Sequence, residues 1–198
     1  MSSAKDRLVV AISGASGAVV GLRMIDIAGA TGRYELHIVV TRAAERTIAH
    51  ETGPAALDRL AQVAARRHDV DDIGACIASG SFRTQAMIVA PCSMRSLAAI
   101  SIGLSDNLLT RAADVHLKER RRLVLLVRET PLHAGHLRAM LNVTDMGAIV
   151  MPAVPAFHAG PAGLDEIVDH LARRALALAL PEAQFGGFVW AGTGFGGG

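Results

Sequence analysis

Short apolar runs alternate with amphipathic segments along most of the chain. Five runs rich in Val, Ile, Leu, Ala and Met have the length of buried strands, and they occupy residues 7–13, 35–40, 86–90, 123–127 and 147–151. The stretches between them favour helices, which we expect at residues 17–28, 42–51 and 54–67. Near-continuous apolar strands separated by helices are typical of a parallel sheet covered on both faces. The pattern therefore predicts an α/β fold.

Composition supports one globular domain. The chain has 198 residues, 51% of them hydrophobic, with a net charge of +2, which argues against a disordered protein. We expect a single domain over residues 1–198, with a core at about 7–180. The aromatic and Gly-rich tail, 181–198, is expected to pack on a neighbouring subunit. No apolar run approaches the ~20 residues of a membrane helix and no secretory signal opens the chain, so the sequence predicts a cytoplasmic protein.

Several classes of site are disfavoured. Aromatic residues are too few for a nucleic-acid stacking platform, and only two cysteines, Cys76 and Cys92, are present, too few for a disulfide framework or a zinc cage. His133 and His136 have ligand-like spacing but no evident third partner, so we expect no metal site. Cys92 has no context typical of acyl transfer.

Candidate chemistry lies in the loops that follow the strands, because ligands bind at the carboxyl ends of strands in open α/β sheets. The first such loop, residues 13–18, is made of small residues that let a ligand approach the backbone, and the helix after it offers N–H groups to a phosphate. A plain strand-to-helix turn would also need these glycines, so both interpretations stay open. The loop lacks the Gly-Lys-Ser/Thr of a Walker A motif.

The later loops predict an anion site beside apolar walls. Ser93 stands where a helix N-cap is expected. Arg128 and Glu129 follow a buried strand, where charges are costly unless they are paired or used. The loop at 152–158 is stiffened by proline and ends in Phe157 and His158.

Seven motifs, in order and spacing over about residues 7–180, resemble the UbiX/Pad1 family of flavin prenyltransferases. They are residues 11–18 (AISGASGA), 79–84 (SGSFRT), 91–94 (PCSM), 106–115 (DNLLTRAADV), 117–121 (LKERR), 128–133 (RETPLH) and 154–157 (VPAF). The resemblance implies a flavodoxin-like or Rossmann-like three-layer fold with a doubly wound parallel sheet, bound FMN and a homododecamer. It also implies transfer of a dimethylallyl group from dimethylallyl phosphate to reduced FMN, without a metal. The product, prenylated FMN, would serve a UbiD-type decarboxylase.

The same resemblance implies roles for individual residues. The positions that match flavin contacts are Gly14, Ala15, Ser16, Thr41, Ser93, Met94, Arg95, Ser96 and Arg128. The positions that match contacts to the donor phosphate are Lys118, Arg128, Arg174 and His158, the last standing where the family usually has Tyr. Glu51 and Glu129 match acidic residues near the reacting centre, and Lys118 is the expected cation for the leaving group. Cations placed on the leaving oxygens would suit ionisation of an allylic phosphate.

Two other functions remain open. One is an accessory subunit that binds FMN and carries it to an aromatic-acid decarboxylase without prenyl transfer. The other is an FMN-dependent cysteine decarboxylase, which would share the fold, although those enzymes resemble a different pattern (PASANT) where this chain has PCSMRS. Neither nucleic acid nor membrane is an expected partner.

Overall fold

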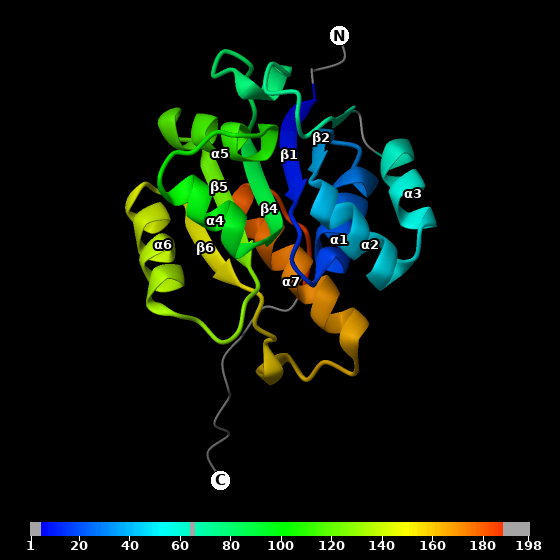
Figure 1. Cartoon of the computed structure of the whole chain (residues 1–198). Helices are drawn as coiled ribbons and strands as arrows, with labels where there is room; N and C mark the ends of the chain where they lie inside the picture. The colour runs from blue at the N-terminus through cyan, green and yellow to red at the C-terminus, as the bar shows by residue number, and fades with distance from the viewer. Residues whose placement is uncertain (1–4, 64–65, 188–198) are drawn as a thin grey trace.

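The protein is built on one six-stranded sheet in which every strand pairing is parallel. The computed structural model describes residues 5–63 and 66–187. The strands lie in the order β3-β2-β1-β4-β5-β6 (Figure 1). They are β1 (Asp6–Ile12), β2 (Tyr34–Val40), β3 (Arg66–His68), β4 (Ala86–Cys92), β5 (Arg122–Val127) and β6 (Ile149–Pro152). This is the Rossmann-type order, and without the three-residue β3 it becomes the flavodoxin order. The expected doubly wound α/β fold is confirmed.

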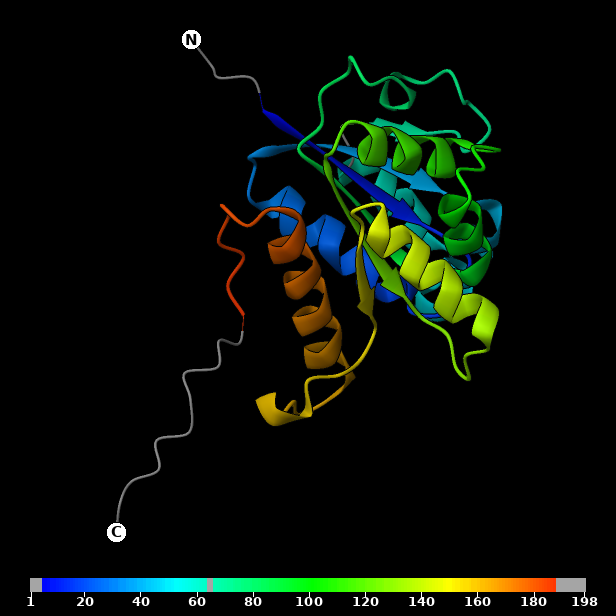
Figure 2. The same ribbon diagram turned by 90° about the vertical axis from the view of Figure 1, so that its left-hand side faces the viewer.

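Helices cover both faces of the sheet, as Figure 2 shows with α7 on one side and α5 and α6 on the other. The first face carries α1 (Ala18–Ala30), α2 (Arg42–Thr52), α3 (Ala55–Val63) and α7 (Leu164–Ala179). The second carries α4 (Met94–Ser101), α5 (Leu108–Lys118), α6 (Ala134–Asp145) and the 3-10 turn η1 (Cys76–Ala78). A further 3-10 turn, η2 (Phe157–Ala159), precedes α7.

Alternation along the central strands explains the two cores. In β1, Leu8, Val10 and Ile12 point into the core beneath α1 and α7, whereas Val9 and Ala11 point into the core beneath α4 and α5. All five side chains are fully buried. None of the described helices combines the length and the hydropathy needed to span a membrane.

Two element boundaries differ from expectation. The helix predicted over 54–67 ends at Val63, and residues 66–68 form the edge strand β3 instead. Because β3 is short and polar, it lacks the apolar run that marks the other strands. The last strand includes Pro152, which is tolerated because β6 is an edge strand. In the expected subunit-contact tail, Phe185 is buried against Tyr34 of its own chain, with ring centroids 6.3 Å apart, and residues 188–198 lie outside the described residues.

Candidate active site

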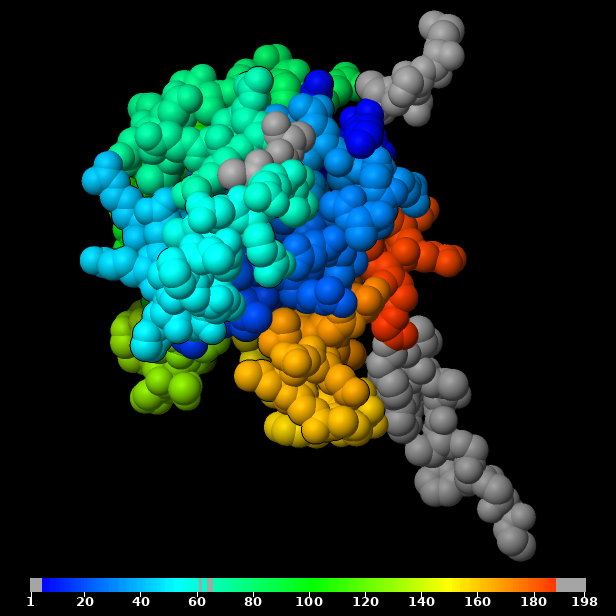
Figure 3. Space-filling model, turned by 90° about the vertical axis from the view of Figure 1, so that its right-hand side faces the viewer, coloured from blue at the N-terminus to red at the C-terminus, as the bar shows by residue number. Residues whose placement is uncertain are grey.

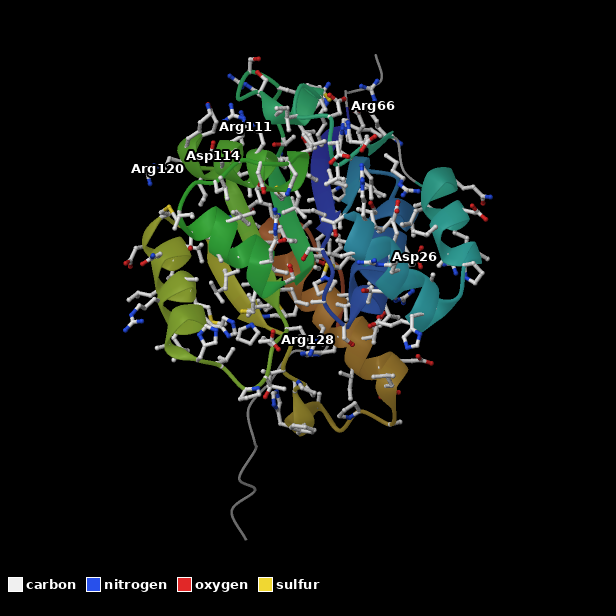
Figure 4. The ribbon with its side chains drawn as sticks, in the orientation of Figure 1. Asp26, Arg66, Arg111, Asp114, Arg120 and Arg128 are labelled. Atoms are coloured by element: carbon white, nitrogen blue, oxygen red, sulfur yellow. The ribbon has the colours of Figure 1, made fainter. Side chains whose placement is uncertain are left out.

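The loops expected to carry chemistry meet at the carboxyl edge of the sheet. The chain leaves β1 for α1 on one face, and it leaves the neighbouring β4 for α4 on the other face. This divergence creates the crevice in which doubly wound proteins bind their ligands. Arg128, which follows β5, lies at this edge, at the lower end of the sheet in Figure 4.

Ser13 holds the two loops of the crevice together. Its hydroxyl donates to the carbonyl of Pro91 at 2.8 Å and accepts from the N–H of Ser93 at 2.7 Å. Its own N–H also donates to the Pro91 carbonyl, at 3.1 Å. Since Ser13 is almost fully buried, these bonds fix the distance between the loop after β1 and the loop after β4.

Two glycines allow close approach beside the crevice. A Cβ on Gly14 would lie 2.4 Å from the Cβ of Ala43 at the start of α2. A Cβ on Gly21 would lie 2.1 Å from the carbonyl oxygen of Ala90, so α1 packs directly on the backbone of β4. Such contacts leave no room for a side chain at either position.

Hydroxyl groups cap the helices that begin at this edge. Thr41 accepts from the N–H of Ala44 at the start of α2, and Ser93 accepts from the N–H of Ser96 at the start of α4. The Ser93 hydroxyl also donates to the buried hydroxyl of Ser96 at 3.2 Å. The expected N-cap role of Ser93 is confirmed. Burial raises the pKa of the adjacent Cys92 thiol to about 12, so Cys92 is not a thiolate nucleophile.

Arg128 bridges the outer loops. Its Nε donates to the carbonyl of Ser16 at 3.2 Å, which joins the end of β5 to the loop after β1. The next residue, Glu129, is exposed and accepts from the N–H of Thr130 at 3.0 Å. The structure thus brings Ser16, Arg128 and Glu129 to one edge.

Glu51 has a structural role that sequence analysis did not foresee. Its carboxylate accepts from the N–H of Gly17 at 2.8 Å and from the N–H of Val19 at 3.3 Å. The expectation that the start of α1 offers its N–H groups to a phosphate is therefore wrong for these two groups, because a carboxylate from α2 already binds them.

Comparison with known proteins agrees with this geometry. The family model described as Flavoprotein matches residues 1–176. The flavin prenyltransferase UbiX of Neisseria meningitidis is 52% identical over 172 residues, which cover 87% of this chain and 90% of the relative. The chain belongs to the UbiX/Pad1 family of flavin prenyltransferases.

Two solved structures of UbiX-type proteins superpose closely. A crystal structure of AnUbiX (PadA1) in complex with FMN and dimethylallyl pyrophosphate has a TM-score of 0.83 and 45% identity, with coverage of 88% of this chain and 92% of that one. A dodecameric FMN-dependent UbiX-like decarboxylase from Escherichia coli O157:H7 has a TM-score of 0.83 and 44% identity, with coverage of 86% and 92%.

The crevice of this UbiX-family chain suits FMN. Small residues line the loop after β1, hydroxyl groups come from Thr41 and Ser93, and the guanidinium of Arg128 supplies a cation for a phosphate or an electron-rich ring. Gly14 can accept no Cβ, so the loop keeps its backbone exposed. These are the features that a planar, phosphorylated cofactor requires.

Lys118 lies at the opposite edge of the sheet from Arg128. Lys118 ends α5 just before β5 begins, whereas Arg128 follows the last residue of β5. The six residues of β5 span roughly 20 Å. In Figure 4 the neighbouring Arg120 lies far above Arg128. One chain therefore does not bring together the residues expected to hold the donor phosphate.

The surroundings of Lys118 form a second cluster, which sequence analysis did not place. Its ammonium donates to Glu119 at 2.6 Å and thereby holds the pKa of that carboxyl below its usual value. A Cβ on Gly80 would meet both side chains, at 2.8 Å from Nζ of Lys118 and 2.2 Å from Oε1 of Glu119. Arg121 donates to the carbonyl of Phe82 at 3.0 Å and also to that of Gly80. We call this the amino-edge cluster: Gly80, Phe82, Lys118, Glu119 and Arg121. The SGSFRT motif was its sequence signal.

The remaining expected residues do not gather at one point: Met94, Arg95 and His158 follow strand ends at the carboxyl edge, whereas Arg174 lies toward the far end of α7. Arg95 is exposed and paired with Asp106, and Met94 is half-buried against the core. His158 is exposed in η2, and Arg174 is exposed in the last third of α7. An allylic cation requires a closed apolar pocket, and residues 5–63 and 66–187 of one chain do not enclose Ser16, Glu129 and His158, which are all exposed.

A separate cleft of about 660 Å³ lies between α1, α3 and the start of α7, on the face shown in Figure 3. Its described lining includes Arg23, Asp26 and Arg173 but none of the residues matched to flavin or donor contacts. It is therefore distinct from the crevice at β1 and β4.

Proposed function

We propose that this chain catalyses transfer of a dimethylallyl group from dimethylallyl phosphate to N5 and C6 of reduced FMN, and that a UbiD-type decarboxylase uses the prenylated FMN. Membership of the family and the FMN and dimethylallyl pyrophosphate named for AnUbiX support this activity. The observation that carries it is the crevice between β1 and β4, where Ser13 joins two flavin-type loops and Arg128 closes over Ser16.

FMN would occupy this crevice as the acceptor substrate. Gly14, Ala15 and Ser16 would face it from the loop after β1, and Ser93, Met94, Arg95 and Ser96 from the start of α4. Thr41 and Arg128 would border it from β2 and β5. Reduced FMN supplies nucleophilic ring atoms for carbon–nitrogen and carbon–carbon bond formation.

The charged residues would act on the donor. The allylic carbon–oxygen bond breaks and phosphate leaves with the electron pair, so cations on its oxygens lower the barrier. Arg128, Lys118 and Arg174 would supply that charge, and His158 would donate a hydrogen bond in place of the family Tyr. Bond formation at N5 would release the N5 proton. Ring closure at C6 would take up a proton at the remaining allylic double bond and release the C6 proton, so Glu129 or the departing phosphate would carry these protons. Glu51 would lie near the reacting centre together with Glu129, in addition to accepting hydrogen bonds from the start of α1.

We further propose that the site is completed between copies of the chain. Lys118 and Arg128 lie at opposite ends of β5, so a phosphate can touch both only if they come from different copies. The E. coli relative is named as dodecameric, and we propose a homododecamer here as well. Closure by a neighbouring copy would also exclude water from the exposed edge.

The test is mass spectrometry of the flavin after the protein is incubated with reduced FMN and dimethylallyl phosphate. We expect FMN to gain one C₅H₈ unit, and parallel samples with the pyrophosphate or with no donor identify the donor used. A flavin that is bound but stays unmodified with both donors would support the carrier function instead. Release of CO₂ from a cysteine-ended peptide would support the cysteine decarboxylase.

A further inference from the structure

A cluster of metal-binding side chains lies apart from the crevice and borders the amino-edge cluster through Phe82. His37 on β2, His68 on β3 and Cys76 in η1 each offer a ligand atom, and these atoms all lie within 4.8 Å of one another. His37 and His68 are 1% and 7% exposed, and Cys76 is half-buried. Within residues 5–63 and 66–187, these are the residues whose potential ligand atoms group in this way.

The two imidazoles have nearly the spacing of a ligand pair. Nδ1 of His37 and Nε2 of His68 are 2.9 Å apart, and the rings are stacked with centroids 5.2 Å apart. Two nitrogens bound to a tetrahedral Zn²⁺ at 2.0–2.1 Å would be about 3.3 Å apart. If the distance between the two nitrogens increased by a few tenths of an ångström, a cation could take the place of the one proton that lies between them.

The far side of His37 has the partner that a ligating histidine usually has. Its Nε2 lies 3.3 Å from Oε1 of Glu35, although the angle does not make a hydrogen bond and Nε2 has no other partner among the described residues. Glu35 is itself held by Nε of Arg7 at 3.0 Å. A histidine that binds a metal typically donates its second N–H to a carboxylate, which fixes the tautomer and raises the basicity of the ligand. A small rotation of the His37 ring would complete this arrangement.

The surroundings keep the ligands in the form that binds a metal. Burial lowers the pKa of His68 to about 4 and also lowers that of His37, so both imidazoles are neutral near pH 7. The charges that act on them are mixed: Arg7 and Arg66 oppose a cation, whereas Glu35 and Asp72 favour one. The half-buried thiol of Cys76 provides access from solvent.

We propose that Nδ1 of His37, Nε2 of His68 and the sulfur of Cys76 bind one Zn²⁺ ion, with water in the fourth position. Two imidazoles and a thiolate form a ligand set that suits this ion. Binding releases the proton of the Cys76 thiol. The proton between the two imidazoles moves to the ring nitrogen that faces away from the ion, so both imidazoles stay neutral ligands. Neither the prenyl transfer nor the flavin crevice involves these residues.

The ion would tie two segments of weak local structure, β3 and η1, to the buried strand β2. β3 has only three residues, η1 is a single 3-10 turn, and the segment between η1 and β4 carries the Gly80 and Phe82 of the amino-edge cluster. The ring of Phe82 already contacts His37 edge-on, with centroids 5.2 Å apart. A bound ion would hold this segment against β2 and raise the free energy of unfolding, because it binds only the folded arrangement.

Cobalt substitution tests the site directly. Full-length protein is treated with a chelator, and Co²⁺ is added while spectra are recorded. We expect one Co²⁺ per chain, a near-ultraviolet thiolate-to-cobalt band, and d–d bands of a tetrahedral ion to the red of the flavin absorption. Zn²⁺ should displace the cobalt and raise Tm in a concentration-dependent manner.

Matched variants identify the ligands. Cys76→Ser should abolish the thiolate band, whereas Cys92→Ala, which removes the other thiol of the chain, should keep it. Glu35→Gln should lower the affinity for Zn²⁺ about 10- to 100-fold. Cys76→Ser is isosteric at a half-buried position, so retained FMN and an unchanged Tm without metal show that it folds. The proposal is overturned if Co²⁺ gives no thiolate band, or if Cys76→Ser binds Zn²⁺ as tightly as the parent protein.

Discussion

The carboxylate of Glu51, near the end of α2, accepts a hydrogen bond from the backbone N–H of Gly17 at 2.8 Å, at the first turn of α1. Gly17 has a φ of 95°, which turns the chain into the helix and points its N–H toward α2. Glu51 thus does for α1 what an N-cap side chain usually does, but from a different helix. It also fixes the loop that carries Ser16.

We expect Glu51→Ala to lower the free energy of unfolding by about 1 kcal/mol, the usual effect of losing a helix cap. Glu51→Gln keeps an acceptor oxygen and should retain most of that stability. Urea unfolding of both variants measures the effect. If Glu51→Ala unfolds at the same urea concentration as the parent protein but has lost prenyl transfer, the contact with α1 contributes no stability and only the catalytic assignment stands.

Gly14 supports a second prediction. A Cβ at this position would lie 2.4 Å from the Cβ of Ala43, so one of the two segments must move. We expect Gly14→Ala to lower the free energy of unfolding by about 1–3 kcal/mol and to reduce the FMN content of purified protein.

The control is the double variant Gly14→Ala/Ala43→Gly, which removes the clashing Cβ. It should recover FMN content, at the cost of about 0.5–1 kcal/mol for glycine inside a helix. The flavin absorbance per chain and the Tm report both effects. Equal loss of FMN in the single and double variants would show that contact with Ala43 is not the cause.

Strong local patterns explain which parts of the fold could be predicted. The buried strands β1, β4 and β5 are continuous apolar runs, and the sequence predicts both ends of each to within two residues. A parallel topology then predicts that Ser93 and Arg128 lie at the same edge of the sheet. β3 was missed because Arg66 and Arg67 have no apolar pattern and pair only with β2.

Contacts between distant segments explain what could not be predicted. The bond from Gly17 to Glu51 depends on how α2 packs beside α1, and the pair His37–His68 depends on the alignment of β3 with β2. Lys118 and Arg128 are only ten positions apart in sequence, yet a strand lies between them. The LKERR and RETPLH motifs identify the two residues as site candidates, but they do not show that the residues lie at opposite edges of the sheet.

His116 supports a prediction about acid stability. It is 1% exposed on α5, where its Nδ1 contacts the carbonyl of Ala112 at 2.7 Å and its Nε2 contacts the hydroxyl of Thr84 at 2.9 Å. Burial, and to a smaller extent the charge of the nearby Arg121, lowers its pKa to about 4. The unfolded chain therefore binds the proton more tightly, and stability that is present above about pH 6.5 is lost as the pH falls toward 4.

We expect His116 to contribute a loss of up to about 1.4 kcal/mol per pH unit between roughly pH 6.5 and pH 4. His116→Gln keeps a polar contact for Thr84 but does not titrate, so its stability should fall less steeply. Urea unfolding at several pH values in this range gives both curves. His37 and His68 titrate in both proteins and cancel in the difference. Parallel curves would show that His116 is accessible to protons in the folded state.

Lys118 and Arg128 provide a test of a site shared between copies. Lys118→Ala should leave FMN bound but slow prenyl transfer by about 10²–10³-fold, because a preorganised cation on the leaving group is lost. Arg128→Ala should be similarly slow.

Mixed oligomers of these two variants test whether the site is shared, because each variant alone has the same defect in every chain. If the two variants are co-expressed with different tags and purified as mixed oligomers, some sites combine the intact Arg128 of one chain with the intact Lys118 of its neighbour. For random mixing at equal amounts, about a quarter of the sites are complete, so about a quarter of the parent activity should return.

The matched control mixes Lys118→Ala with a Lys118→Ala, Arg128→Ala double variant, in which no complete site can form. If the mixed oligomers are as inactive as this control, Lys118 and Arg128 do not meet across a subunit contact, and the donor phosphate is held by residues of a single chain.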